Sequence, residues 1–237
     1  MTNPSLRFDE LYASALEGDL AGRDALTDEE RLAVQLGGLA ALGLGSTELT
    51  GELLSLMSEG CPPELAEDVL IQMAAYIGYP HTRRYLDCLK AAMAHQGQCS
   101  QGKAHTFSGA ERHAAGIADY ARLNPDALNT INAAFGALAP DVIERTFRIF
   151  GDVYASSRQP LQVRQLATIS ALAVLGSAAP QLRFHIGAGR HVGLSEAQLV
   201  EVIAWVQFFA GAPAAYNALI ELKASLAEGS DATPAYQ

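Results

Sequence analysis

The chain has 237 residues, of which 49% are hydrophobic and 18% charged, so it can bury a sizeable core and lacks the composition of a disordered chain. Its formal net charge of -10, with no local cluster of Lys or Arg, argues against binding to nucleic acid or to an anionic membrane surface. Abundant alanine and leucine, with only 7% aromatic residues, predict an all-α fold.

The first half of the chain reads as a series of helices separated by glycine and proline. We expect helices over residues 5–16, from Thr27 through Leu42, over 49–59, from Pro62 to Gly78, and from Pro80 onward. Thr27 and Glu30 have the spacing of a capping box, and Gly60 suits the end of the third helix. The helix after Thr27 is apolar almost all round, which predicts a buried central helix.

A polar segment, QGQCSQGKAHTFS at residues 96–108, is interpreted as a linker. It places a boundary near residue 105 and divides the chain into units 1–105 and 106–237. The second unit is expected to hold helices over 110–123, from about 125, over 140–155, from 160 to 175, over 181–192, from Ser195 to Gly211, and from Pro213 onward. Ser195 and Gln198 again have capping-box spacing.

An internal repeat relates the two units at an offset of 133 residues, running without a gap from Arg31 over Arg164 to Lys90 over Lys223. The 60 aligned positions hold 13 identities, among them the glycines and prolines that end and start helices. Gly43, Gly60, Gly78 and Pro80 fall on Gly176, Gly193, Gly211 and Pro213. The sequence therefore predicts two tandem copies of one helical unit.

The N-terminal sequence lacks a basic flank followed by an apolar run, and no stretch has the roughly 18 apolar residues that a membrane-spanning helix needs. We therefore expect a cytoplasmic protein. The three cysteines, Cys61, Cys88 and Cys99, form no CxxC pair, which argues against a disulfide framework or a zinc knuckle.

The stretch FGDVYASSRQPLQVRQLATISALAVLGSAAPQLRFHIGAGRHVGLSEAQLVEVIAWVQFFAGAPAAYNA resembles the core of the carboxymuconolactone decarboxylase family. The resemblance rests on the order and spacing of the FGDVY segment, the L-x-x-H turn, the G-L-S helix start and the G-x-P-x-A-x-N-A ending. The leading segment ERHAAGIADYARLNP is similar to the N-terminal helix of the family. The resemblance is close over residues 111–226 and looser over 27–90.

The resemblance implies an all-α unit of the AhpD-like type that assembles as trimers or hexamers, and a two-copy chain would by analogy form a homotrimer with pseudo-sixfold character. Its members include decarboxylases of carboxylated muconolactone, in aromatic catabolism, and AhpD-type thiol peroxidases. The peroxidases need a CxxC pair, whereas this chain has Leu182-Arg183-Phe184-His185 at that place and Leu49-Thr50-Gly51-Glu52 in the first copy. Thiol peroxidase activity is therefore the less favoured alternative.

His185 lies where the decarboxylase branch carries its histidine, and it is our catalytic candidate, because imidazole can move a proton near neutral pH. The structural alternative is a core histidine bonded to a carbonyl. Asp152, in the FGDVY segment, is the candidate that orients His185 or holds a proton; the alternative is a surface aspartate at a helix end.

The candidate substrate-binding residues are Arg164, Trp205, Gln207, Tyr216 and Asn217. Arg164 would pair with a substrate carboxylate, although an arginine that opens a buried helix more often anchors a structural ion pair, and Arg31 has the same place in the first copy. An aromatic as wide as Trp205 favours flat or apolar ligands.

The resemblance implies a polar pair in each copy: the histidine of the L-x-x-H turn, and a histidine or glutamine six residues before the glycine of the G-x-P turn. Each copy keeps one of these two residues. The second copy has His185 but carries Trp205 where the first copy has Gln72, and the first copy has Glu52 in place of the histidine. Three interpretations follow: a composite site, a degenerate first copy that serves as a scaffold, or a pocket reshaped by Trp205 and Gln207. We favour the scaffold, with the active pocket in the second copy.

No metal or cofactor is expected. His185 and His191 lie six residues apart and so on different faces of a helix, and His105 and His113 offer no ligand spacing either. The leading hypothesis is a cofactor-independent lyase that acts on a small carboxylated lactone or related cyclic acid with His185 as general acid/base. The alternative is a non-catalytic binding or assembly protein whose sites have decayed.

Overall fold

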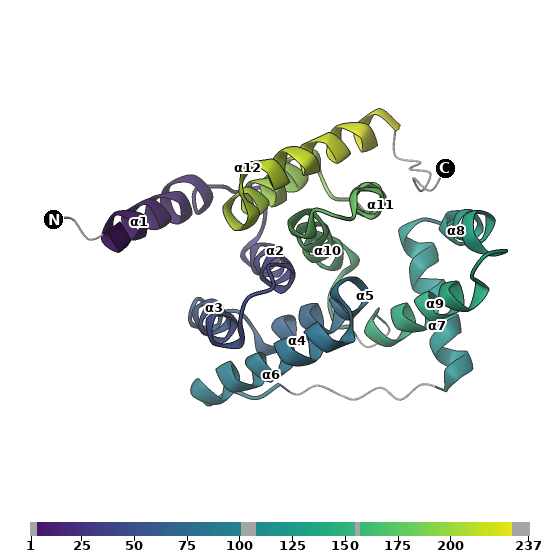
Figure 1. Ribbon diagram of the computed structural model, residues 1–237, viewed down its shortest axis with the longest axis horizontal. Coiled ribbons are helices and arrows are strands. Elements are labelled where there is room, and N and C mark those ends of the chain that lie inside the picture. Colours follow the sequence, from purple (N-terminus) through teal and green to yellow (C-terminus); the bar gives the residue numbers. More distant parts are fainter. Residues whose placement is uncertain (1–3, 101–107, 155–156, 229–237) are drawn as a thin grey trace.

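The computed structural model describes residues 4–100, 108–154 and 157–228, and its regular elements in these ranges are all helices, which confirms the all-α prediction. Figure 1 shows their arrangement. In chain order they are α1 (Pro4–Ala13), a π-helical segment (Ser14–Leu20), α2 (Asp28–Ala41), α3 (Ser46–Ser58), α4 (Pro63–Gln72), α5 (Ala74–Ile77), α6 (Tyr79–His95), α7 (Gly109–Leu123), α8 (Ala127–Phe135), α9 (Pro140–Tyr154), α10 (Leu161–Leu175), α11 (Ala179–His191) and α12 (Glu196–Glu228).

Both predicted capping boxes are present. The Thr27 hydroxyl accepts from the Glu30 amide at 3.3 Å, and a Glu30 carboxylate oxygen accepts from the Thr27 amide at 2.9 Å. Ser195 and Gln198 exchange the same pair of bonds at 3.2 and 3.0 Å. These bonds satisfy amides that a helix start leaves unpaired, which is why the local sequence was sufficient to locate both starts.

Helix α12 corrects the expectation that no stretch of the chain is long and apolar enough to span a membrane. By length and composition it is apolar enough to cross a membrane, although one such helix is weak evidence, since the core helix of a folded domain passes the same test. Gly211, with φ 81° and ψ 173°, interrupts the helical backbone, and Pro213 follows in the first turn after the break. Side chains on both sides of the break, such as Trp205 and Leu222, are buried in the same core. We therefore interpret α12 as two core helices joined at a kink.

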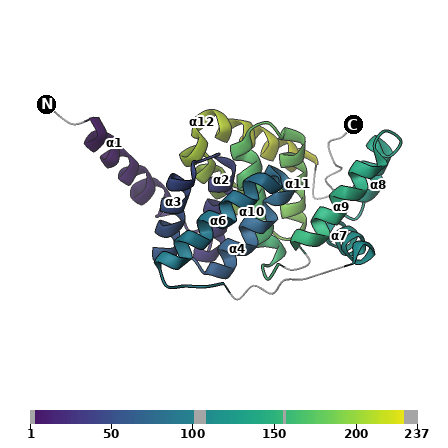
Figure 2. The ribbon, with the colours of Figure 1, turned by 60° about the horizontal axis from the view of Figure 1, so that its bottom comes forward.

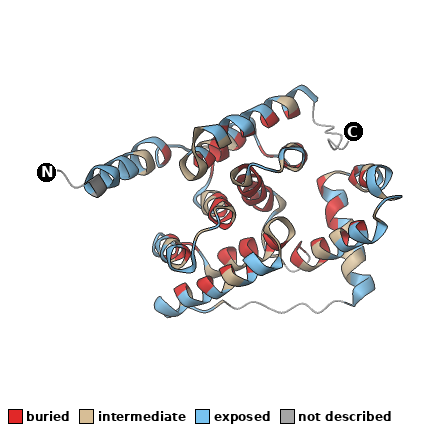
Figure 3. Ribbon diagram, viewed as in Figure 1, coloured by how far each residue is buried: buried red, intermediate tan, exposed pale blue. Residues whose placement is uncertain are grey.

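Helices α2 and α10 lie side by side at the centre of the molecule, with α3, α4 and α6 on one side and α11 and α12 on the other (Figures 1 and 2). The burial colouring in Figure 3 marks α10 as almost entirely buried, as predicted for a central helix. A Cβ placed on Gly37 would lie 2.2 Å from the carbonyl oxygen of Ala167, so the two backbones approach closely. The Ser170 hydroxyl donates to the carbonyl of Val34 at 2.8 Å in the same crossing.

The two halves of the chain share their cores. The cluster under α3, α4 and α6 includes Val163, Ala167 and Ala171 of α10. The cluster under α11 and α12 includes Leu26 and Val34 from the first half. The division at residue 105 therefore does not separate two independent cores.

Helix boundaries and backbone angles agree at the offset of 133 residues. Helix α3 maps from Ser46–Ser58 onto the bounds of α11, Ala179–His191. The matched glycine pairs have φ of 70° and 68° (Gly43 and Gly176), 100° and 101° (Gly60 and Gly193), and 81° and 81° (Gly78 and Gly211). This agreement is what a tandem duplication would produce, and the duplication itself stays a prediction.

Helices α7 and α9 form a tight pair beside the central layers (Figure 1). A Cβ on Gly116 would lie 1.7 Å from the carbonyl oxygen of Phe147, and one on Gly151 would lie 1.8 Å from that of Arg112. The C-terminal end of α9 contacts α4 and α5, which brings Tyr154 against the first half of the chain.

We expect Gly37→Ala to lower the free energy of unfolding by about 2 kcal/mol or more, because the new methyl group must push α2 away from α10. Gly51→Ala is the matched control. Gly51 lies inside α3, and a Cβ added there would have nothing within 4 Å, so this substitution should raise the free energy by about 0.5 to 1 kcal/mol. Urea unfolding of both variants tests the pair; equal effects would contradict the close approach.

Candidate functional site

His185 lies in the interior, on α11, with 3% of its surface exposed. Its Nδ1 lies 2.9 Å from the side-chain oxygen of Gln165 on α10. The rings of Phe184 and Tyr76 meet the imidazole edge-on, with centroids 5.0 and 5.3 Å away. Its hydrogen-bond partner is a side chain, whereas the structural alternative expected a backbone carbonyl.

Burial lowers the pKa of His185 to about 3, because the apolar surroundings penalise the charged imidazolium. The ring is therefore neutral near pH 7. With the oxygen of Gln165 facing Nδ1, that nitrogen carries the hydrogen and donates it, which leaves the lone pair on Nε2. His185 is thus suited to accept a proton or a hydrogen bond at Nε2.

Arg164 precedes Gln165 on α10 and is 4% exposed. Its guanidinium lies over the ring of Tyr154, 3.9 Å from the centroid, and its Nε has no hydrogen-bond partner among the described residues. In the described part of the chain, no carboxylate forms a salt bridge with it, although Asp119 lies near enough to act on it electrostatically. Burial lowers the pKa of Arg164, as expected for a cation without a direct counter-ion.

Arg31, the counterpart of Arg164, behaves differently. Its guanidinium pairs with Asp28 at 2.9 Å, donates to the carbonyl of Leu26 at 3.2 Å, and lies 3.8 Å from the buried carboxylate of Glu201. The interpretation of a structural ion pair thus fits Arg31 and does not fit Arg164.

Two tyrosines from opposite halves meet beside Arg164. The hydroxyl of Tyr76 on α5 is hydrogen-bonded to that of Tyr154 on α9. Burial raises the pKa of both phenols, whereas a hydrogen bond with Thr168 lowers the pKa of each. Gln72 donates from Nε2 to the Thr168 hydroxyl at 2.7 Å and to the carbonyl of Arg164 at 2.8 Å.

We refer to these seven side chains as the buried polar cluster: Gln72, Tyr76, Tyr154, Arg164, Gln165, Thr168 and His185. Two of them come from the first half of the chain. The geometry therefore corresponds to the composite arrangement, and the favoured interpretation of the first half as a scaffold stays a prediction. The composite geometry arises because α4 and α5 pack against α10, which carries three members of the cluster.

The counterpart of this cluster is largely apolar. At the offset of 133 residues, Gln72 and Tyr76 correspond to Trp205 and Phe209, whose rings stack with centroids 6.0 Å apart. Trp205 is 2% exposed and belongs to the core under α11 and α12. Phe209 also packs against Gly38 of α2. One of the two related places in the chain is thus polar, and the other is filled by aromatic rings.

Asp152 does not orient His185, contrary to the prediction. Both of its carboxylate oxygens accept from the guanidinium of Arg112, on the face of α9 that packs against α7. Gln165 holds the imidazole instead. The expected contact with His185 is absent because Asp152 lies two residues before Tyr154 on α9 and therefore points away from the cluster, whereas the role of binding a proton on the substrate stays a prediction.

The proposed ligand-binding residues on α12 lie apart from the buried polar cluster. Gln207, Tyr216 and Asn217 are exposed, Tyr216 by 63%. Their helix turns these positions outward, while Ala215 and Ala218 face the core. Glu52, the first-half counterpart of His185, is half-buried on α3 and acts on Tyr12, whose pKa it helps to raise.

The remaining polar candidates show no metal-binding arrangement. His185 is buried and His191 is exposed, as expected for opposite faces, while His105 lies outside the described residues. In the described ranges no three His, Cys, Asp or Glu side chains are close enough to share a metal ion. Cys61, Cys88 and Cys99 are free thiols, and burial raises the pKa of Cys61 to about 12.

Sequence reasoning missed Tyr76, Tyr154, Gln165 and Thr168. Tyr154 ends the FGDVY segment, so the resemblance could have indicated it. Tyr76 had no such signal, because its partner lies 78 residues away in the chain. Gln72 was noted only as the counterpart of Trp205.

Residues 140–224 match the model of the Carboxymuconolactone decarboxylase family. This range runs from α9 to near the end of α12 and includes Tyr154, Arg164 and His185, but not Gln72 or Tyr76. No curated protein matches the chain.

We expect wild-type protein to lose about 2 kcal/mol of unfolding free energy between pH 7 and pH 5 through His185 alone. The folded-state pKa is lowered from 6.5, so between that value and about 3 the unfolded chain binds the extra proton, and acid favours unfolding. His185→Gln should lack this loss, and His191→Gln, which changes an exposed residue of the same helix, should keep it. Urea unfolding at both pH values measures it; a parallel loss in wild type and His185→Gln would contradict the lowered pKa.

Proposed function

The chain belongs to the carboxymuconolactone decarboxylase family through residues 140–224, and on this premise we propose that it is a cofactor-independent lyase. The proposed substrate is a small carboxylated lactone or a related cyclic acid, from which the enzyme removes CO2. The proposed site is the buried polar cluster.

The observation that carries the proposal is the buried guanidinium of Arg164. A charge removed from water costs several kcal/mol unless a counter-ion and hydrogen bonds offset it. Arg164 is 4% exposed, has an unpartnered Nε, and forms no salt bridge with the described residues. A substrate carboxylate would supply the missing charge, and its two oxygens match the geometry of guanidinium donors.

The chemistry requires one proton. When the bond between the ring carbon and the carboxylate breaks, its electron pair stays on the ring as a delocalised carbanion, and a proton must reach that carbon. His185 is the proposed acid/base group, since it is neutral in the resting site and Gln165 fixes its orientation. A bound carboxylate nearby would raise its pKa and allow it to take up a proton.

The principal alternative is a binding or assembly protein without catalysis. The burial of His185 and Arg164 supports this alternative, because a ligand must displace packed side chains to reach them. The side-chain partner of His185 and the uncompensated charge of Arg164 support catalysis. A thiol peroxidase is the least supported, since the thiols are free and burial raises the pKa of Cys61, which suppresses the reactive thiolate.

The proposed homotrimer has support from α1. Figure 1 shows α1 extending away from the other helices, and Leu6, Phe8 and Leu11 on it are 62%, 64% and 59% exposed. Neighbouring apolar side chains exposed in this way are typical of a contact surface. If the trimer forms through α1, Phe8→Asp should shift the mass measured by light scattering towards the monomer, and an unchanged mass would exclude this contact.

The test of the lyase proposal compares Arg164→Met with wild type on carboxymuconolactone and related carboxylated lactones, with CO2 release as the readout. We expect kcat/KM to fall about 100-fold or more, because the carboxylate loses its counter-ion. The same variant should match or exceed wild type in unfolding free energy, by up to about 2 kcal/mol, since an uncompensated charge leaves the interior.

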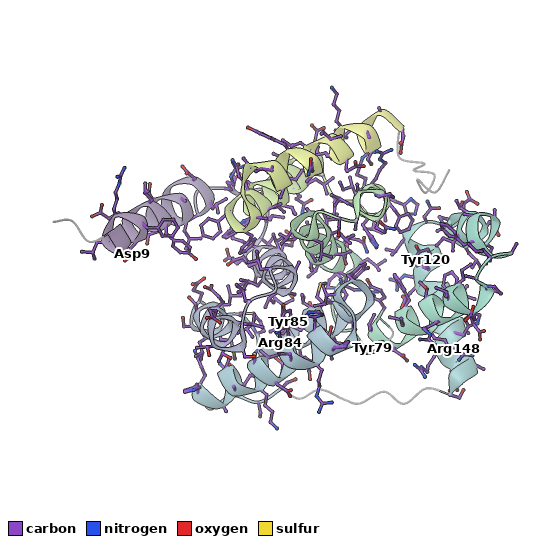
Figure 4. The ribbon with its side chains drawn as sticks, viewed as in Figure 1. Asp9, Tyr79, Arg84, Tyr85, Tyr120 and Arg148 are labelled. Carbon is purple, nitrogen blue, oxygen red and sulfur yellow. The ribbon has the colours of Figure 1, made fainter. Side chains whose placement is uncertain are left out.

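Arg148→Met is the control, because Arg148 lies on the outer surface of α9 and pairs there with Glu144 (Figure 4). It should leave turnover unchanged within about twofold, as exposed pairs contribute little. The absence of CO2 release from every lactone with wild-type protein would rule out the proposed activity. A loss of both stability and activity in Arg164→Met would show that Arg164 is structural.

A further inference from the structure

We propose that Tyr154 is a catalytic acid of the same site and that Tyr76, from the other half of the chain, is its positioning residue. This inference rests on the proposed function, since it concerns the source of the proton that replaces CO2. It assigns a chemical role to the first half of the chain, which the family match does not cover.

The hydroxyl of Tyr154 lies at the meeting point of the cluster. It is hydrogen-bonded to the hydroxyl of Tyr76, and its ring lies under the guanidinium of Arg164 at 3.9 Å. Tyr154 is 2% exposed, and Tyr76 is partly buried. A carboxylate bound by Arg164 would therefore lie beside a phenol that is shielded from water.

The surroundings of Tyr154 favour loss of its proton more than those of Tyr76. Burial raises the pKa of both phenols, but Arg164 and the hydrogen bonds with Tyr76 and Thr168 lower the pKa of Tyr154, whereas the hydrogen bond with Tyr154 raises the pKa of Tyr76 further. Either hydroxyl can donate in this hydrogen bond, and the proposal assigns Tyr76 as the donor and Tyr154 as the acceptor. An oxygen that already accepts a hydrogen bond beside a cation is suited to become a phenolate.

Other charged or titratable groups face the pair from each neighbouring helix. Asp119 on α7 opposes Arg164 by raising the pKa of Tyr154, and Tyr120, also on α7, raises that of Tyr76. From α11, the neutral ring of His185 meets the ring of Tyr76 edge-on. Figure 4 shows the labelled Tyr120 on the side of α7 that faces α11, and its ring stacks on Phe184 at 5.4 Å. Among these groups Arg164 is the cation, and it lies 3.9 Å from the centroid of the Tyr154 ring.

Atoms and electrons balance in the proposed proton transfer. The bond between the ring carbon and the carboxylate breaks, CO2 leaves, and the electron pair remains on the ring. The Tyr154 hydroxyl then gives its proton to the carbon, and its oxygen becomes a phenolate beside Arg164. Tyr76 passes a proton to that phenolate and regains one from water, so each turnover consumes one solvent proton.

This division of roles follows from opposite environments. Burial keeps His185 neutral in the resting site, so it accepts a hydrogen bond at Nε2, whereas the phenol of Tyr154 already carries the proton that the carbanion needs; the delivery of that proton is therefore assigned to Tyr154 in place of His185. Titratable neighbours whose environments push their pKa values apart are the usual acid and base of an active site. His185 then holds the substrate through Nε2, and Tyr154 completes the reaction.

The experiment compares Tyr154→Phe, Tyr76→Phe and Tyr85→Phe with wild type, with CO2 release from carboxymuconolactone and related carboxylated lactones measured across pH. Tyr85→Phe is the matched control, because Tyr85 is 1% exposed in the core of the first half and its hydroxyl has no partner (Figure 4). All three changes keep the aromatic ring, so Arg164 retains its contact in Tyr154→Phe.

For Tyr154→Phe we expect kcat to fall at least about 100-fold with KM within about threefold, which is the usual contribution of a general acid. Tyr76→Phe should lower kcat about 10-fold and move the alkaline limb of the pH profile to higher pH, since the hydrogen bond that favours the phenolate is lost. Tyr85→Phe should match wild type. Unfolding in urea confirms that each variant is folded.

Three results would overturn all or part of the inference, and each affects a different claim. If wild type releases CO2 and Tyr154→Phe does so within about threefold, the acid role fails while the proposed function stands. If wild type releases CO2 from none of the lactones, both fail together. A reduced kcat in Tyr76→Phe without a displaced alkaline limb would overturn the positioning role of Tyr76.

Discussion

The close crossing of α2 and α10 is the constraint on which the rest of the structure depends. Gly37 allows the α2 backbone to lie against the carbonyl of Ala167, and Ser170 ties α10 to the carbonyl of Val34. These contacts are related by the repeat, because residues 34 and 37 correspond to 167 and 170. Because the two central helices lie so close, each half must complete its core with side chains of the other, and α4 and α5 come to lie over α10.

The crossing of α2 and α10 creates two positions that the repeat relates to each other, and side chains of different kinds occupy them. In one, Gln72 and Tyr76 bring polar atoms to Arg164 and Thr168. In the other, Trp205 and Phe209 bring aromatic rings to the crossing. The aromatic side chains need few buried hydrogen bonds and stabilise the fold through packing. In the polar cluster, by contrast, each buried donor and acceptor needs a hydrogen-bond partner. The unpartnered Nε of Arg164 and Nε2 of Gln165 show that the cluster does not satisfy all of them.

The buried hydrogen-bond donors without partners in the polar cluster have a physical consequence. A protein that retains a buried charge without a direct counter-ion gives up stability at that point, and such sites are commonly where a ligand supplies what is missing. The apolar surroundings that keep His185 neutral also strengthen any electrostatic contact made there. Stability and the proposed chemistry thus make opposite demands on α10, and the surrounding shared core offsets the cost in stability.

The sequence by itself determined the helices and their ends, because capping boxes, prolines and positive-φ glycines act within a few residues. Thr27, Ser195 and Gly211 are examples. It also indicated Arg164 and His185 through their place in a recognised pattern. The tertiary structure alone decided which side chains meet them. Tyr76 reaches Tyr154, and Gln165 replaces Asp152 as the partner of His185, because helices from both halves cross at the centre, and no local pattern encodes that crossing.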